Sequence, residues 1–151
     1  ELSQSTPMVV LTQTTLSVDD TRRSVKTIKR RYPNALVRND ICYATTNRQM
    51  SVKQLAQRVE LVLVIGAQNS SNCNRLVELA KSCGIPAYLI NGPEELDQRW
   101  LIDVQRVGVT SGASTPEELL QKVVQKLEPD QVTILESVPE DVIFTLPEDM
   151  R

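Results

Sequence analysis

Apolar and polar residues follow one another in blocks along this chain, and the clearest blocks lie in its middle. Leu61 to Ile65 is a continuous apolar run of strand length, as expected where both faces of a parallel sheet are covered. A helical pattern follows, whose apolar face carries Leu76, Leu79, Ala80 and Cys83. Gly84 is placed to end that helix and Pro86 to block its continuation. Ala87 to Ile90 is the next expected strand, which completes a strand, helix, strand unit of a parallel α/β sheet.

The same order recurs before and after this unit. Short apolar segments predict further strands or extended pieces at Met8 to Thr12, Ala35 to Val37, Ile41 to Tyr43, Val107 to Thr110 and Val142 to Leu146. Helical spacing predicts apolar faces made of Val18, Val25 and Ile28, then Val52, Leu55 and Val59, then Leu119, Leu120, Val123, Val124 and Leu127. The expected N-terminal caps are Ser17 with Asp20, Thr46 with Gln49, and Thr115 with Pro116 and Glu118. The predicted fold class is α/β, with parallel-sheet βαβ subdomains.

The expected strand-to-helix loops share small polar residues. They are TQTT at Thr12–Thr15, CYATTN at Cys42–Asn47, GAQNSSN at Gly66–Asn72 and TSGAST at Thr110–Thr115. In an open parallel sheet such loops lie at the carboxyl ends of the strands, where ligands bind. Each loop precedes a helix, whose first N–H groups are unpaired and whose dipole favours an anion. The loops therefore predict one rim that binds a phosphate or diphosphate. The alternative is ordinary helix capping, for which the same residue types are favoured.

Composition narrows the class of protein. The chain has 151 residues, of which 40% are hydrophobic, enough for one core or one core and part of a second. A net charge of −2 with both signs interspersed argues against a nucleic-acid partner. The basic residues Lys26, Lys29, Arg30 and Arg31 are expected on a solvated helix end. No apolar run approaches membrane-spanning length and no secretory signal is visible, so we expect no membrane partner.

The chemistry available to the chain is restricted. It has no histidine, the commonest general base, and neither a GxGxxG fingerprint nor a GxxxxGK[ST] phosphate loop. Its three cysteines, an odd number without CxxC spacing, favour a reducing compartment, and we expect the protein to be cytoplasmic. Cys83 is expected to pack on an apolar helix face, and Cys73 to be a partly packed residue in a first helical turn. Cys42 ends an expected strand on the ligand rim, where it is either a metal ligand or nucleophile, or a structural cysteine.

Four strings closely resemble the hydroxymethylbutenyl diphosphate reductase family, also called IspH or LytB, and the likeness runs over almost the whole chain. They are TQTTLSVDDT from Thr12, DICYATTNRQ from Asp40, NSSNCNRL from Asn69 and VGVTSGASTPEEL from Val107. The resemblance implies an iron–sulfur oxidoreductase of the last step of non-mevalonate isoprenoid biosynthesis. Such an enzyme reductively dehydroxylates an allylic diphosphate to isopentenyl and dimethylallyl diphosphate. The resemblance further implies a 4Fe-4S cluster held by three cysteines, and a ferredoxin or flavodoxin as electron donor.

Site residues follow from the same resemblance. It implies that Cys42 is a cluster ligand, which suits a thiolate near iron. It implies that Thr14 is a catalytic residue near the substrate hydroxyl and that Thr15 beside it binds substrate. The implied diphosphate cradle consists of Ser70, Ser71, Asn72 and Ser114. These positions fall on the loops that the residue pattern alone assigns to an anion-binding rim.

The chain also departs from the family's pattern. The family has two further cluster cysteines, two substrate-binding histidines and a glutamate in an amino-terminal half, and this chain has no counterpart of that half. The resemblance therefore implies that this chain is the carboxyl-terminal portion of a bacterial, cytoplasmic enzyme. In that portion residues 1–39 end a second subdomain, 40–128 form a complete three-layer third subdomain and 129–151 form a tail.

Two consequences are expected. The portion should be inactive without the amino-terminal half, which would be its partner together with the substrate. The alternatives are a diphosphate-binding module without redox chemistry and a purely structural fragment. The first segment is too small to close a layered architecture alone, so it should expose apolar surface and make the isolated chain marginally stable or prone to associate.

Overall fold

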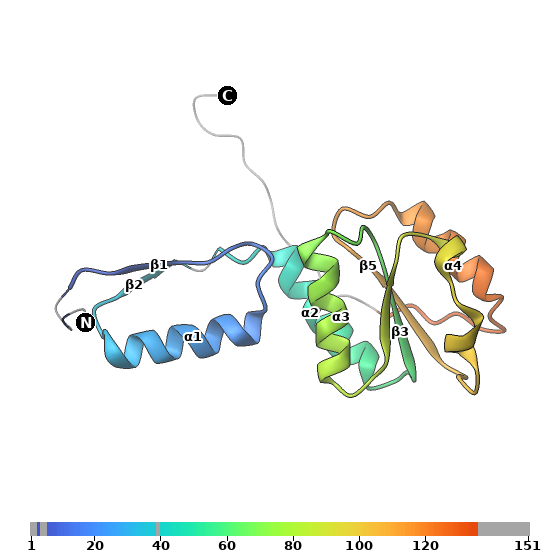
Figure 1. Ribbon diagram of the computed structural model, residues 1–151, viewed down its shortest axis with the longest axis horizontal. Coiled ribbons are helices and arrows are strands. Elements are labelled where there is room, and N and C mark those ends of the chain that lie inside the picture. The colour runs from blue at the N-terminus through green and yellow to red at the C-terminus, as the bar shows by residue number, and fades with distance from the viewer. Residues whose placement is uncertain (1–2, 4–5, 39, 136–151) are drawn as a thin grey trace, which may run out of the picture.

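The computed structural model describes residues 3, 6–38 and 40–135. Its strands form two parallel sheets, one pairing β1 with β2 and the other in the order β4-β3-β5. Four α-helices, α1 to α4, lie along these sheets (Figure 1). The predicted α/β fold class is confirmed. The strand expected at Val142 to Leu146 lies outside the described residues.

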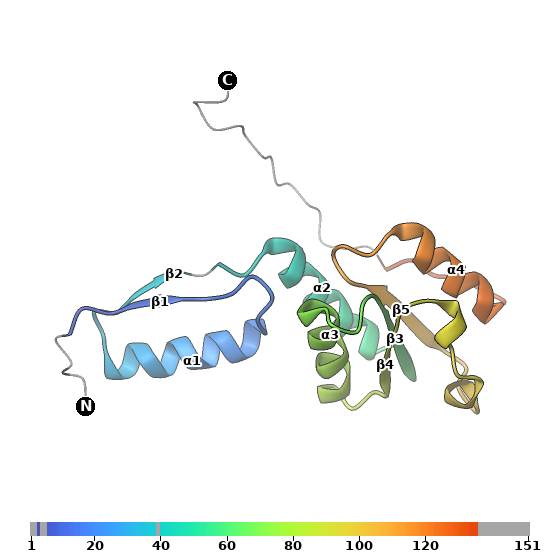
Figure 2. The same cartoon turned by 45° about the horizontal axis from the view of Figure 1, so that its top comes forward.

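The first unit consists of β1 (Val9–Leu11), α1 (Val18–Arg31) and β2 (Leu36–Arg38). The two strands are parallel, with Val9 opposite Leu36. The expected cap of α1 is confirmed, since the Asp20 N–H donates to the Ser17 hydroxyl oxygen at 3.2 Å. Figures 1 and 2 show α1 running along one side of the strand pair.

One helix cannot cover both faces of this small sheet. Val9, Leu11 and Leu36 are 59%, 71% and 54% exposed, and no residue of α1 is buried. Exposed apolar side chains on neighbouring parallel strands are unusual, because parallel sheets are normally covered on both faces. The expectation that the first segment exposes apolar surface is therefore confirmed.

The second unit contains the main core. Its elements are α2 (Tyr43–Ala56), β3 (Leu61–Ile65), α3 (Ser71–Ser82), β4 (Ala87–Ile90), the short 3-10 helices η1 (Pro93–Glu95) and η2 (Gln98–Leu101), β5 (Val107–Ser111) and α4 (Glu117–Leu127). The central strand β3 pairs in parallel with both β4 and β5. Every residue of β3 is buried, which explains its unbroken apolar sequence.

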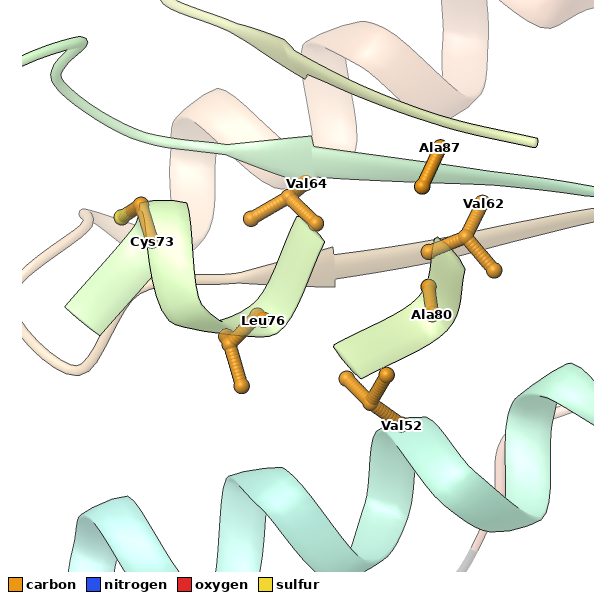
Figure 3. Packing of buried hydrophobic residues seen from close by; sticks show 7 residues of the cluster. All are labelled: Val52, Val62, Val64, Cys73, Leu76, Ala80 and Ala87. Atoms are coloured by element: carbon orange, nitrogen blue, oxygen red, sulfur yellow. The ribbon is translucent and has the colours of Figure 1, made fainter. Parts of the chain in front are cut away.

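The side chains of β3 alternate between two packed faces. One face meets α2 and α3 in a cluster drawn in Figure 3, made of Val52, Val62, Val64, Cys73, Leu76, Ala80 and Ala87. The other face meets α4, η1 and η2 in a cluster made of Leu61, Leu63, Ile65, Ile90 and Val123. Leu119, Leu120 and Leu127 of α4 pack against the second cluster, as the helical spacing predicts. The unit thus has three layers, with helices on both sides of one sheet.

The start of α2 differs from the sequence expectation. Tyr43 is already helical, so the extended piece expected at Ile41 to Tyr43 does not form as such. Cys42 is the N-cap, because its carbonyl accepts the Thr46 N–H at 3.0 Å and closes the first turn there. The expected cap residue Thr46 lies inside the helix and its hydroxyl donates to the same carbonyl at 3.3 Å. The capping box of Thr46 and Gln49 is therefore wrong.

Two further expectations are corrected. The N-cap of α4 is Pro116, not Thr115, because the Thr115 hydroxyl is used elsewhere and donates to the Ile65 carbonyl at 3.0 Å. Cys83 is exposed at the end of α3 instead of packing in the core. The helix stops there, and the Ile85 N–H reaches back to the Ala80 carbonyl at 3.2 Å, which brings the Ile85 side chain against the core in its place.

None of the helices within the described ranges has the length and apolar content that a membrane crossing requires.

Gly108 of β5 provides a test of the packing between the sheet and α2. A Cβ atom at this position would lie 2.6 Å from Leu55 Cγ. We expect Gly108→Ala to lower the free energy of unfolding by about 1–3 kcal/mol through overpacking, measured by urea denaturation. Gly92→Ala is the matched control, since its Cβ would meet the flexible end of the Glu94 side chain. Equal stability of the two variants would contradict the close approach of α2 to β5.

Candidate functional site

The loop between β3 and α3 is folded by its own backbone. The Gly66 N–H donates to the Ile90 carbonyl at 3.0 Å, and a turn closes where the Ser70 N–H donates to the Ala67 carbonyl at 2.9 Å. Ser70 then caps α3, because its hydroxyl oxygen accepts the Cys73 N–H at 3.3 Å. Sequence reasoning correctly expected this loop to lead into a helix, and the cap fixes where its first turn begins.

The loop after β5 is fastened to the same place. The Ile65 carbonyl at the end of β3 accepts the Gly112 N–H at 2.9 Å and the Thr115 hydroxyl at 3.0 Å. The sulfur of Cys73 fills the space between the two loops, since a Cβ atom on Gly66 or Gly112 would lie 2.4 or 2.5 Å from it. Only glycine permits this approach on both sides. The structure therefore brings the NSSN and TSGAST loops together, as predicted for a common rim.

Asn72 is the most informative side chain in this arrangement. The residue is 7% exposed, and neither its amide nitrogen nor its amide oxygen has a hydrogen-bond partner. Leaving a buried amide unpaired costs about 1–3 kcal/mol, so such groups are rare without a ligand or water to satisfy them. The Asn72 amide nitrogen lies 3.9 Å from the position that a Cβ on Gly112 would occupy. The unsatisfied amide is thus placed where the two loops meet.

The other residues of the expected cradle surround Asn72 in sequence or in the adjoining loop. Ser70 is half-buried, and Ser71 and Ser114 are exposed. The Ser70 oxygen already accepts the cap hydrogen bond, but its own hydrogen remains available to donate. Both loops carry only uncharged residues. Any anion bound here would be held by neutral donors and by the positive end of the α3 dipole.

A second pair of segments meets at the start of α2. The Asp40 N–H donates to the Thr12 hydroxyl oxygen at 2.8 Å, and the Cys42 N–H donates to the Thr14 carbonyl at 3.3 Å. These bonds place Cys42 beside the loop after β1, as Figures 1 and 2 show for the start of α2. Thr14 is exposed, whereas Thr15 and Cys42 are half-buried. Cys42 makes no side-chain cap hydrogen bond, so its thiol is not committed to the helix end.

Gln49 of α2 connects the second unit to the segment that follows β1. Its amide oxygen accepts the Val18 N–H at 3.0 Å, and its amide nitrogen donates to the Leu16 carbonyl at 2.9 Å. Sequence reasoning assigned Gln49 to a capping box and missed this bridge, because its partners lie more than 30 residues away in the chain. A glutamine one turn before Val52, on the helix face that is buried, is the signal that could have indicated it.

Charged residues at the start of α1 reinforce the same junction. Asp19 pairs with Lys53 of α2 at 2.5 Å, and Asp20 lies 3.6 Å from Arg75 of α3. Hydrogen bonds from the Arg23 and Ser17 side chains hold the pKa of Asp20 below its ordinary value. Asp20 therefore stays ionised, and its pairing persists until the pH falls through that lowered pKa. These pairs are solvent-exposed, so each contributes little alone.

The three cysteines lie in three different environments. Cys73 is sealed between the loops, Cys83 is exposed at the far end of α3, and Cys42 stands alone beside the first loop. In the described part of the chain, no three histidine, cysteine or acidic side chains are grouped so that they could hold a metal ion. A metal centre built on Cys42 would need ligands from elsewhere.

Comparison with known proteins identifies the family. The family model described as "LytB protein" matches residues 1–128. The chain belongs to the LytB family. This membership agrees with the resemblance carried by the four sequence strings, three of which lead into the α-helices that follow β1, β3 and β5.

Individual LytB proteins match over nearly all of this chain. A 4-hydroxy-3-methylbut-2-enyl diphosphate reductase of Actinobacillus pleuropneumoniae serotype 5b (strain L20) is 46% identical over 155 residues, covering 99% of this chain and 49% of that protein. The enzyme of the same name from Haemophilus ducreyi is 47% identical over 149 residues, covering 95% and 48%. The solved reductase of Plasmodium falciparum superimposes with a TM-score of 0.83 at 33% identity, covering 99% and 49%. The chain thus spans about half the length of the relatives it matches.

The Gln49 bridge can be tested directly. We expect Gln49→Leu to lower the free energy of unfolding by about 1–3 kcal/mol, because it leaves the Val18 N–H and the Leu16 carbonyl without their partner. Gln54→Leu is the matched control on the same helix, since Gln54 is exposed. Urea denaturation of both variants is the measurement. Indistinguishable stabilities would show that the bridge does not hold the two units together.

Proposed function

We propose that this chain is the carboxyl-terminal half of a 4-hydroxy-3-methylbut-2-enyl diphosphate reductase, and that its paired loops bind the diphosphate of the substrate. The observation that carries the proposal is the buried, unpartnered amide of Asn72 at the meeting point of the two loops. The names of the relatives, which match this chain over most of its length, support the same substrate class.

The diphosphate end of the substrate would be held by neutral donors. Asn72 offers its amide hydrogens, Ser70 and Ser71 offer hydroxyls from the start of α3, and Ser114 offers one from the loop after β5. The N-terminal end of α3 adds its unpaired N–H groups and its dipole. Since these donors are held before the ligand arrives, binding would spend little energy on reorganising them.

The other end of the substrate would lie toward Thr14, Thr15 and Cys42. A 4Fe-4S cluster, when bound, would supply the electrons of the reduction and the Lewis acidity of iron. The thiol of Cys42, which makes no cap hydrogen bond, fits one of its ligands, because cysteine sulfur is the usual protein ligand of iron in such clusters. The remaining ligands would come from the half of the relatives that this chain does not match. Thr14 would then orient the substrate hydroxyl.

The half of the relatives that this chain does not match would also cover the exposed surface of the first unit. Val9, Leu11 and Leu36 present an apolar strand face of the kind that a further layer normally buries. The proposed setting is the bacterial cytoplasm, which suits three free thiols and relatives from bacteria. A ferredoxin or flavodoxin is the proposed electron donor.

Asn72 permits a test in which affinity and stability change in opposite directions. We expect Asn72→Leu, which keeps the approximate shape, to abolish binding of inorganic diphosphate in isothermal titration calorimetry. The same change should raise the free energy of unfolding by about 1 kcal/mol, because it removes an unsatisfied buried amide. The control is Asn34→Leu, which changes an asparagine between α1 and β2, at the end of the first unit far from these loops. A destabilised variant that still binds diphosphate would mean that Asn72 is only structural.

The cluster ligand can be tested with two matched cysteine variants. The chain is mixed under anaerobic conditions with the amino-terminal half of a LytB relative, iron and sulfide, and substrate-dependent oxidation of reduced viologen is followed. We expect Cys42→Ser to lose the visible absorption of the cluster and all activity, and the exposed Cys83→Ser to retain both. Diphosphate binding without any cluster in the wild-type mixture would leave a binding module and reject the reductase.

A further inference from the structure

Asn74 makes an unusual set of contacts on the loop that precedes its own helix. Its side-chain amide nitrogen donates to the Gln68 carbonyl at 2.8 Å and to the Ser70 carbonyl at 3.0 Å. Its backbone N–H also donates to the Ser70 carbonyl at 3.0 Å. The side chain is exposed, so these bonds are not a by-product of burial in the core. One residue thus fastens two peptide groups of the loop.

Fixing a carbonyl also fixes the N–H of the next residue. A trans peptide unit is planar, with its C=O and N–H directed to opposite sides, and the described residues contain no cis peptide bond. The carbonyls of Gln68 and Ser70 face Asn74. The N–H groups of Asn69 and Ser71 therefore point away from Asn74.

These two N–H groups are available to a ligand. Within the described ranges, neither the Asn69 nor the Ser71 N–H has a backbone acceptor. They lie on either side of Ser70, whose own N–H donates to the Ala67 carbonyl, and Ser71 directly precedes Asn72 with its unpartnered amide. Successive backbone N–H groups held in a turn at a helix start form an anion-binding concavity.

A second bond steadies the same part of the loop. The Gln68 side chain donates to the Leu89 carbonyl on β4 at 3.0 Å. Gln68 is therefore held by its carbonyl to α3 and by its side chain to the sheet. The peptide between Gln68 and Asn69 has little freedom to rotate.

We infer that Asn74 is a positioning residue, which aligns the Asn69 and Ser71 N–H groups as donors to the diphosphate without touching the ligand itself. The inference rests on the proposed function of these loops as a diphosphate site. It adds the Asn69 N–H to the donors already described and names the residue that orients it together with the Ser71 N–H. Substitution of Asn74 should free the two peptide groups to rotate and so weaken binding, while the core stays intact.

The test compares Asn74→Leu with Gln125→Leu, an exposed amide on α4 whose side chain makes no hydrogen bond among the described residues. Inorganic diphosphate is titrated into the full 151-residue chain by calorimetry, and backbone amide resonances are followed by NMR. We expect wild type and Gln125→Leu to bind equally and to show diphosphate-dependent shifts of the Asn69 and Ser71 N–H resonances. We expect Asn74→Leu to bind on the order of tenfold more weakly, with both shifts reduced and the thermal midpoint unchanged.

The possible results distinguish a failure of the inference from a failure of the proposed function. Wild-type affinity in Asn74→Leu, or diphosphate shifts absent from Asn69 and Ser71 in a wild-type chain that binds, would overturn the inference and leave the proposed function standing. No binding by the wild-type chain would overturn the proposed function and the inference with it. If Asn74→Leu fails to fold, Asn74→Ser keeps the comparison, since a serine hydroxyl offers one donor where the amide offers two. It should then bind with intermediate affinity, and wild-type affinity in Asn74→Ser would overturn the inference.

Discussion

The Ile65 carbonyl is the point on which the arrangement of the site depends. It ends the buried central strand, and it accepts both the Gly112 N–H and the Thr115 hydroxyl. A carbonyl oxygen has two lone pairs, and here both serve to hold the loop after β5 against the end of β3. Every other feature between the loops presupposes this attachment. Without it, Cys73 would have no second wall and Asn72 would not be enclosed.

That attachment also explains the glycines. Cys73 occupies the gap that the two loops leave, and its sulfur comes within the volume of any side chain at Gly66 or Gly112. The cysteine is therefore a spacer between backbones, which is how a small polarisable side chain is often used in a core. Its burial, at 2% exposure, follows from the loops closing around it.

Sequence reasoning predicted the elements well where one strong local signal was present. The unbroken apolar run of β3, the Ser17 cap and the glycine after α3 each needed only neighbours within a few residues. It failed where a polar side chain had two possible partners. Thr115 and Gln49 match capping patterns, yet both bond to distant backbone atoms. The energy of a local cap and of a distant bridge is similar, so only the tertiary fold decides between them.

The site itself was predictable in outline but not in detail. The polar loops and the family resemblance indicated the residues, while the two bonds of Asn74 to the loop carbonyls depend on how the turn at Ala67 to Ser70 closes. An asparagine four residues after a serine N-cap is the only signal that the sequence carries for it. Backbone donors have no side chain, and therefore no sequence signature of their own.

The two paired loops carry no charged side chains, and this affects both the rate at which an anion reaches them and the effect of salt on its binding. Dipoles act over short distances, whereas lysine and arginine attract anions from beyond the first hydration layer. A ligand would thus reach these loops by unassisted diffusion, and added salt would screen its binding only weakly. Selection among anions would then rest on how many oxygens match the fixed donors in number and direction, so a diphosphate would be favoured over a single phosphate by geometry and not by charge.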